Sequence, residues 1–262
     1  MSLVTTTTDA RGVATLTLNR PEKHNALDGA SMRDLDAALA AVNGDASIRV
    51  VVLTGAGASF CAGADIGHMR SMMNASEEQN VEDALLLARC LRSLDELDRP
   101  VIARVNGNVF GGGVGLVACA DIAIGAASAR FALTEVRLGI VPAAISPYVV
   151  TAIGNREARR LFLTAAPFDA EAACKLGLLH FVVPPDQLDA AVEGQVDLLL
   201  RGGPQALRAA KKLVRRVTQF TDRDVLSDEN ARLLARLRVS PEGKEGLSAF
   251  LERRTPQWRP GD

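Results

Sequence analysis

Short β-prone runs and helical spacings alternate along the first part of the chain. Residues 3–8 and 13–18 are two β-prone runs, and the turn-forming residues 9–12 between them predict a hairpin. Apolar side chains then recur at helical spacing from Met32 to Val42, behind Asp28 as an N-cap. The continuous apolar run 49–54 predicts a strand that is covered on both faces of a sheet.

The succession of strand, glycine-rich loop and helix then occurs twice. The strand at 49–54 leads through the loop 55–65 to a long helix, which carries Val81, Leu85, Ala88, Leu91 and Leu94 and stops before Pro100. The strand at 101–105 leads through a second glycine-rich loop, 106–115, to a small-residue helix at 114–120. The repeated plan predicts an α/β fold for this part of the chain.

The rest of the chain is predicted to be mostly helical from Arg156 onward. One helix is expected at 169–176, and three more between about Asp186 and Arg254. Residues 182–185 and 202–204 have the composition of linkers, and Pro241 is expected to start the last helix.

The composition indicates a soluble globular protein. The chain has 262 residues with 30 basic and 31 acidic side chains, and its net charge of −1 gives no general attraction to nucleic acid or to an anionic membrane. The apolar stretches are shorter than the roughly 20 residues that a membrane span requires, and the start of the chain lacks the plan of a signal peptide. We therefore expect a cytoplasmic protein that binds neither nucleic acid nor membrane.

Cysteine and histidine are too few and too scattered for a zinc site or a disulfide framework. The four cysteines form no C-x-x-C pair, and the three histidines lie far apart in the sequence. Cys61 lies in the first glycine loop and is a possible nucleophile, but the reading as a small apolar residue is favoured. No metal is expected.

The two glycine loops suggest a site for a negatively charged oxygen. Each follows a buried strand, and each could direct one backbone N–H at a single point, as an oxyanion hole requires. The simpler interpretation is that the glycines allow tight turns and close helix packing. A dinucleotide site is disfavoured, because the third glycine of G-x-G-x-x-G would fall at Leu116, and the phosphate-loop pattern is absent.

Glu135 is the candidate acid/base. It is the only acidic residue between Phe131 and Pro142, in a largely apolar stretch, and such surroundings raise the pKa of a carboxyl group. The alternative is a structural glutamate that pairs with Arg137 or with a surface lysine.

Five stretches of the chain, in order and at their spacing, resemble the enoyl-CoA hydratase/isomerase (crotonase) family. They are Asn19-Arg20-Pro21 with Asn25-Ala26-Leu27, Phe60 to Asp65, Asn106-Gly107 with Phe110 to Gly113, Cys119 to Ile122, and the ending Glu245 to Arg254. The resemblance implies a spiral core of repeated ββα units at 1–195, and a helical region at 196–262 that forms homotrimers or hexamers.

The resemblance also implies a site for an acyl-CoA thioester, with no separate cofactor. The backbone N–H groups of Ala64 and Gly112 would form the oxyanion hole, and Glu135 would transfer protons. The coenzyme A side would be lined by Lys23, Ala26, Ala62, Asp65 and Ile66. Phe250 and Arg253 would reach the nucleotide bound to a neighbouring subunit.

One position departs from the family pattern. Hydratases of the family use a second glutamate just after the triple glycine, and Gly115 stands there. A single glutamate suits an enoyl-CoA isomerase, and a noncatalytic thioester-binding protein is a third hypothesis. The segments 111–118, 132–139 and 145–148 resemble bacterial methylglutaconyl-CoA hydratases, so a hydratase is favoured. His68, Arg70 and Arg137 are then candidates to bind the carboxylate of that substrate.

Overall fold

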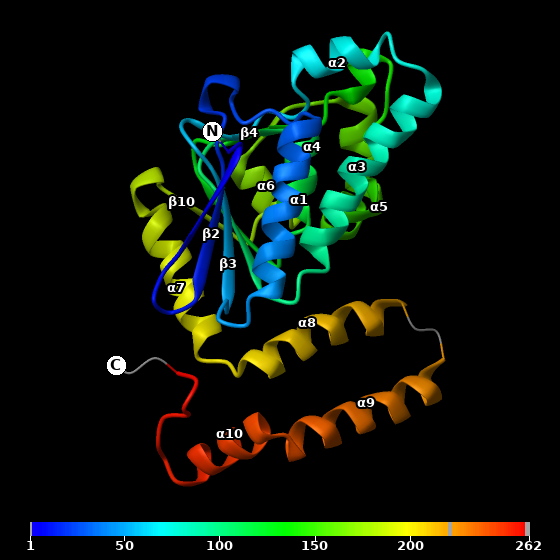
Figure 1. Cartoon of the computed structure of the whole chain (residues 1–262). Helices are drawn as coiled ribbons and strands as arrows, with labels where there is room; N and C mark the ends of the chain where they lie inside the picture. The colour runs from blue at the N-terminus through cyan, green and yellow to red at the C-terminus, as the bar shows by residue number, and fades with distance from the viewer. Residues whose placement is uncertain (1, 220–221, 260–262) are drawn as a thin grey trace.

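The computed structural model describes residues 2–219 and 222–259 and contains two β-sheets (Figure 1). In the larger sheet β1 and β2 are antiparallel and the other neighbours are parallel, so the predicted hairpin is confirmed. The order of this sheet is β1 (Val4–Thr8), β2 (Val13–Leu18), β3 (Val50–Gly55), β5 (Val101–Val105), β7 (Ile122–Ala126) and β10 (Phe181–Val183).

The smaller sheet is built from short strands that follow the strands of the larger one. Its order is β4 (Ser59–Cys61), β6 (Asn108–Phe110), β8 (Arg130–Ala132) and β9 (Phe168–Asp169). β4, β6 and β8 pair in parallel in the same order as β3, β5 and β7. The chain therefore advances by one strand in both sheets with each turn, which confirms the expected spiral α/β fold.

Helices cover the sheets and extend into the tail. Three short 3₁₀ helices, η1 (Pro21–Lys23), η2 (Glu135–Leu138) and η3 (Pro185–Gln187), lie in the connections. The helices that accompany the sheets are α1 (Gly29–Gly44), α2 (Ile66–Met72), α3 (Glu77–Asp95), α4 (Gly112–Ala118), α5 (Ser146–Thr164), α6 (Ala170–Leu176) and α7 (Leu188–Leu200).

The first long helix forms where its apolar spacing and its cap predict it. The carboxylate of Asp28 accepts a hydrogen bond from the backbone N–H of Ser31, and the Ser31 hydroxyl accepts one from the N–H of Asp28. Met32, Leu35, Leu39 and Val42 are buried, as their spacing indicates. This face of α1 packs on α3 and on the first strands.

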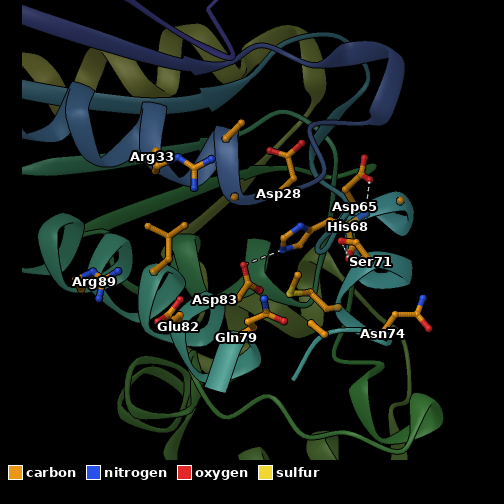
Figure 2. Close-up of a pocket in the computed structure, with 16 residues that line it drawn as sticks. Asp28, Arg33, Asp65, His68, Ser71, Asn74, Gln79, Glu82, Asp83 and Arg89 are labelled. Carbon is orange, nitrogen blue, oxygen red and sulfur yellow. Dashed lines mark hydrogen bonds and ion pairs between the residues drawn. The ribbon is translucent and has the colours of Figure 1, made fainter. Parts of the chain in front are cut away.

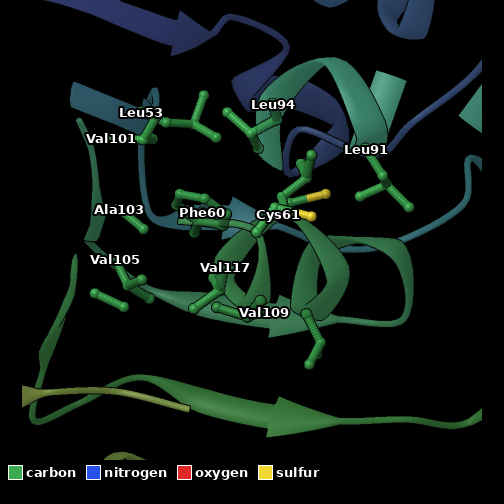
Figure 3. Close-up of a cluster of buried hydrophobic side chains, with 14 of the residues drawn as sticks. Leu53, Phe60, Cys61, Leu91, Leu94, Val101, Ala103, Val105, Val109 and Val117 are labelled. Atoms are coloured by element: carbon green, nitrogen blue, oxygen red, sulfur yellow. The ribbon is translucent and has the colours of Figure 1, made fainter. Parts of the chain in front are cut away.

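Apolar side chains are buried on both faces of the larger sheet. Leu53, Val101 and Val105 belong to the cluster between the sheets, where they gather near Phe60 and Leu94 (Figure 3). The opposite face carries Val50, Val52 and Ile102, which are covered by α7. Every residue of β3 is buried, so the predicted two-sided burial is confirmed.

The boundaries of several elements differ from the prediction. Residues 182–185 are not only a linker, because Val182 and Val183 belong to β10 and pair with β7. α4 begins at Gly112, two residues before the predicted start, and α5 begins at Ser146 and contains a non-helical Gly154. α4 begins with two glycines and α5 with Ser146-Pro147, and these residues carry no apolar periodicity.

The tail has one helix more than predicted. The described residues after 186 form four helices, and not three: after α7 come α8 (Pro204–Gln219), α9 (Arg223–Val239) and α10 (Pro241–Leu251), with Pro241 at the predicted helix start. The predicted domain boundary between 195 and 196 falls inside α7, and the division into two regions stays a prediction. Residues 1, 220–221 and 260–262 of those two regions lie outside the described residues.

The last three helices extend away from the sheets as an arm (Figure 1). α8 is attached to the core by ion pairs of Lys211 with Asp121 (2.8 Å) and of Lys212 with Asp98 (2.6 Å). α9 buries none of its residues in this chain. No helix within the described ranges combines the length and the apolar character needed to cross a membrane.

Candidate active site

The two glycine loops leave neighbouring strands at the same edge of the larger sheet. β3 and β5 are adjacent and parallel, so the residues that follow them lie close together. Asn106 joins the two loops: its side-chain oxygen accepts a hydrogen bond from the N–H of Gly55 (3.2 Å), and its amide donates to the carbonyl oxygen of Gly57 (2.9 Å). The second loop therefore holds the first in place.

The loops approach each other so closely that glycine is required. A methyl group on Gly63 would lie 3.0 Å from the carbonyl oxygen of Phe110, and one on Gly111 would lie 3.8 Å from the Cα of Gly63. Both glycines also have positive φ, +85° and +48°. Ala64 and Gly112 directly follow these two glycines, so the structure brings the two predicted donors to one place.

The backbone around Ala64 is hydrogen-bonded on either side of it. The N–H of Leu27 donates to Gly63, and the N–H of Asp65 donates to Leu27. The N–H of Ala64 itself has no hydrogen-bond partner in the described part of the chain, and neither has that of Gly112, the first residue of α4. Two main-chain donors are thus left free beside each other.

Ala64, Gly112 and Glu135 line one cavity of about 380 Å³. Its walls come from the two loops, from α1, α2 and α3, and from the segment after η2. The polar side chains in its lining are those of His68, Asp83, Thr134 and Glu135. The apolar side chains in its lining are those of Leu27, Met32, Ala62, Ala64, Met69, Ala84, Leu87, Phe110, Leu138, Ile140, Val141, Pro142, Ala143, Ala144 and Ile145.

Glu135 begins η2 and turns its carboxylate toward the second loop. Its Oε1 lies 3.1 Å from the point that a methyl group on Gly111 would occupy. Its Oε2 is buried and has no hydrogen-bond partner among the described residues. Burial raises the pKa of Glu135 above its ordinary value of 4.5, and a hydrogen bond with its own backbone offsets this only partly. Within residues 2–219 and 222–259, Glu135 forms an ion pair neither with Arg137 nor with a lysine, so the structural alternative finds no support.

The place of the second family glutamate is filled by apolar side chains. A Cβ on Gly115 would lie 2.3 Å from Cγ2 of Ile145 and 3.3 Å from a methyl of Leu91. Ile145 is 2% exposed and lines the cavity. A side chain larger than glycine at position 115 would therefore require these neighbours to move.

A second, larger hollow of about 940 Å³ lies on the other side of His68 and Asp83, between α1, α2 and α3 (Figure 2). Of the three candidates for binding a substrate carboxylate, only His68 lines the cavity of Glu135. Arg70 and Arg137 are exposed and line neither hollow. These two arginines are therefore poor candidates in this chain.

The residues expected on the coenzyme A side meet around the start of α2. Asp65 caps α2 and lies 3.6 Å from Nζ of Lys23, while Ala62 lines the cavity. Ala26 is buried beside this group, since it neighbours Leu27, which forms a β-bridge to Ala64. Ile66 is 76% exposed at the surface.

Phe250 and Arg253 are not brought to this site within one chain. They lie at the end of α10, at the opposite end of the molecule from α2 (Figure 1). Phe250 is 81% exposed, which leaves it available to another subunit. Their assignment to a neighbour's site stays a prediction.

Several cavity residues were missed from the sequence. Leu27 and Leu87 belong to helical or bridging segments that read as ordinary core, and the segment from Leu138 to Ile145 has no periodic signal. Asp83 offered a weak signal, because it lies one helical turn before Leu87 on the same face of α3. These residues line the cavity only because α3 packs beside the two glycine loops.

The described residues contain no cluster of metal-binding side chains, and no cysteine lines the cavity. No three His, Cys, Asp or Glu side chains lie close enough there to hold a metal ion. Cys61 is fully buried, and burial raises the pKa of its thiol to about 12, so it is a small apolar residue and not a nucleophile.

Comparisons with known proteins show the family of the chain. The chain is 34% identical to the crotonyl-CoA hydratase of Syntrophomonas wolfei (92% of each chain covered) and 34% identical to the 2,3-dehydroadipyl-CoA hydratase of Escherichia coli (94% of this chain, 95% of the relative). It matches the crystal structure of an enoyl-CoA hydratase from Shewanella pealeana with a TM-score of 0.94, 41% identity and coverage of 98% and 96%. The model of the enoyl-CoA hydratase/isomerase family matches residues 8–261. The chain therefore belongs to the enoyl-CoA hydratase/isomerase family and is an enzyme of that family.

Proposed function

We propose that the protein adds water to the double bond of a 2-enoyl-CoA thioester. The observation that carries the proposal is the meeting of two free backbone N–H groups, Ala64 and Gly112, with the partly buried carboxylate of Glu135 on one cavity. Donors of this kind stabilise the oxygen of an enolate, and removing one such donor typically costs about 3 kcal/mol in the barrier.

A single carboxylate is sufficient for the proposed reaction. The thioester oxygen accepts hydrogen bonds from Ala64 and Gly112, while Glu135 takes a proton from water. The water oxygen bonds to C3, and the electrons of the double bond move to the thioester oxygen as an enolate. Protonated Glu135 then returns its proton to C2, the carbonyl re-forms, and the product is a 3-hydroxyacyl-CoA. The raised pKa makes the carboxylate of Glu135 a stronger base toward water, and its protonated form is still acidic enough to protonate the enolate carbon.

Isomerisation of the double bond is the second candidate. Ile145 and Leu91 fill the space where a second proton-transfer group would stand, so a reaction that needs one shuttle is compatible with the site. In this reaction Glu135 takes a proton from one carbon of the enoyl group and returns it to another. No water is consumed.

Methylglutaconyl-CoA is the substrate we propose to test first. The resemblance of the glycine loop and of the Glu135 segment to methylglutaconyl-CoA hydratases supports it, and His68 is a cavity residue able to bind its carboxylate. The two curated relatives act on a short unsubstituted acyl group and on a dicarboxylic one, according to their names. Unsubstituted and dicarboxylic enoyl-CoA substrates should therefore both be tested.

Turnover of enoyl-CoA substrates distinguishes the hydratase, isomerase and noncatalytic hypotheses. Loss of the conjugated thioester absorbance with crotonyl-CoA or methylglutaconyl-CoA is expected for a hydratase. A gain of that absorbance from a 3-enoyl-CoA is expected for an isomerase. Binding of saturated acyl-CoA without turnover of any of them would indicate the noncatalytic hypothesis.

The Glu135→Gln variant tests the proposed proton transfer. It should lower kcat by about 10²- to 10⁴-fold and leave the Kd of a saturated acyl-CoA within about threefold. Glu157→Gln, on the exposed surface of α5, is the matched control and should keep full activity. Unchanged turnover in Glu135→Gln would remove Glu135 from the mechanism.

A further inference from the structure

The cavity of Glu135 and the larger hollow are separated by one pair of side chains. Only His68 and Asp83 are found in the linings of both, among the described residues. His68 lies on the first turn of α2 and Asp83 lies on α3, so the pair also bridges two helices. The pair forms the partition between the two hollows, with the outer one in view in Figure 2.

The pair has one hydrogen-bonding position left open. Nε2 of His68 lies 2.9 Å from Oδ1 of Asp83, and the two side chains are only 18% and 27% exposed. Nδ1 of His68 has no partner within the described residues. Asp83 fixes the orientation of the imidazole ring, and an oriented ring with one free nitrogen can bind an oxygen atom.

The His68–Asp83 pair and the Glu135 carboxylate come from different elements around the cavity. Glu135 and Thr134 come from the segment around η2, whereas His68 and Asp83 come from α2 and α3. Apart from these four, the side chains that line the cavity are apolar. An acyl group held at Ala64 and Gly112 beside Glu135 thus meets one polar wall besides the catalytic one.

We infer that the His68–Asp83 pair determines substrate specificity, by favouring a short acyl group whose far end carries an oxygen function. This inference rests on the proposed acyl-CoA site and names its substrate class. A hydroxyl group can donate to Nδ1 of a neutral His68, and a carboxylate can accept from Nδ1–H of a protonated His68. An unsubstituted alkyl end leaves the nitrogen dehydrated and unpaired, which is unfavourable.

Five-carbon 2-enoyl-CoA thioesters that end in a methyl, a hydroxyl or a carboxylate group form a matched substrate set. The wild-type protein is expected to favour one oxygen-ended substrate over the methyl-ended one by about tenfold or more in kcat/KM. The preferred oxygen function then shows whether His68 acts as acceptor or as donor.

His68→Leu places an apolar side chain at the partition and removes the hydrogen bonds of the imidazole. This variant should bring the ratio of kcat/KM for oxygen-ended and methyl-ended substrates to near one, mainly through loss with the oxygen-ended substrate. Asp83→Asn should reduce this ratio as well. The amide oxygen can still accept the hydrogen bond from Nε2 of His68, but without the negative charge of the carboxylate it holds the ring more weakly. Glu82→Gln, which lines only the outer hollow, should leave the ratio unchanged.

Binding of the saturated analogues keeps the test independent of turnover. Glutaryl-CoA, 5-hydroxypentanoyl-CoA and pentanoyl-CoA bind without reacting, and calorimetry gives their Kd values. If no enoyl-CoA is turned over while the binding preference exists and is lost in His68→Leu, the proposed reaction fails and the specificity inference stands. Equal Kd and kcat/KM values for all three ends in the wild type, or an equal loss for all three in His68→Leu, would overturn the inference.

Discussion

At the scale of single residues, Glu135 lies on the cavity in an environment that is unfavourable for its charge. Its buried Oε2 has no partner in the described chain, and burial raises the pKa of the group. A raised folded-state pKa means that folding favours the protonated carboxyl group. The energetic cost of burying the charge is absent below the pKa of the unfolded chain and fully present above that of the folded protein.

Glu135→Gln should therefore raise thermal stability in a pH-dependent way. At about pH 8 the variant lacks the buried charge and its Tm should exceed that of the wild type. At about pH 4, where the wild-type carboxyl group is mostly neutral, the two Tm values should converge. Calorimetric scans at both pH values check this. A Tm difference that does not depend on pH would show that burial of this charge does not limit stability.

Gly115 stands where hydratases of the family have their second glutamate, and Ile145 packs against it. Its Cβ position lies within 2.3 Å of Ile145, so even Gly115→Ala overfills the core beside the cavity and should cost about 1–3 kcal/mol of unfolding free energy. Adding Ile145→Ala removes the nearest methyl group. Denaturant unfolding of the two single variants and the double variant should show a favourable coupling energy. Strict additivity would mean that Ile145 does not occupy that space.

At the scale of elements, the site depends on two loops that lie against each other and against η2. Gly111 is the point of contact, because it has positive φ, lies next to Gly63 and leaves room for Oε1 of Glu135. Asn106 supplies the hydrogen bonds between the loops. A change at Gly111 thus affects the donor at Gly112 and the carboxylate at the same time.

Gly111→Ala should lower kcat by on the order of tenfold or more, since the methyl group would lie 3.1 Å from Oε1 of Glu135 and displace it. The positive φ adds a stability cost of about 1–3 kcal/mol. Gly177→Ala is the control, because Gly177 also has positive φ, at the end of α6, but lines neither hollow. It should lose stability and keep kcat. Equal kcat in both variants would contradict the role given to Gly111.

At the scale of the whole molecule, the arm formed by α8, α9 and α10 leaves large apolar side chains in solvent. Those of α9 and α10 are Val225, Leu234, Val239, Leu247, Phe250 and Leu251, with exposed fractions from 46% to 81%. Apolar surface of this kind is typical of a subunit interface. It supports the expected association into trimers or hexamers, which stays a prediction.

Light scattering after size-exclusion chromatography should give a mass of three or six chains of 27.7 kDa. Phe250→Asp places a charge in the expected interface, and it should shift the protein to smaller species at micromolar concentration. It should also weaken binding of the coenzyme A nucleotide if Phe250 reaches a neighbour's site. A wild-type protein that stays monomeric at all concentrations would contradict this expectation.

Local patterns predicted the elements whose residues face a core. α1 follows from its cap at Asp28 and its apolar spacing, and β3 follows from a run that is apolar on both faces. The motif pattern also indicated Ala64, Gly112 and Glu135 as one site, and the structure places all three on one cavity. β10, which was expected to be a linker, is a strand because it pairs with β7. The strands of the smaller sheet have only two or three residues, too few for an alternating pattern to predict them.

The sequence by itself determined the first hairpin, the buried strands β3 and β5, the helices α1 and α3, the two glycine loops and the single acidic residue near Pro142. These features depend on side chains that are close along the chain. Only the tertiary structure decided that Ile145 fills the place beside Gly115, that Arg70 and Arg137 lie outside the cavity, and that His68 and Asp83 form a wall. Such contacts join residues from different turns of the spiral. Their geometry is set by how α2, α3 and the segment after η2 pack around the loops, and no local pattern encodes that packing.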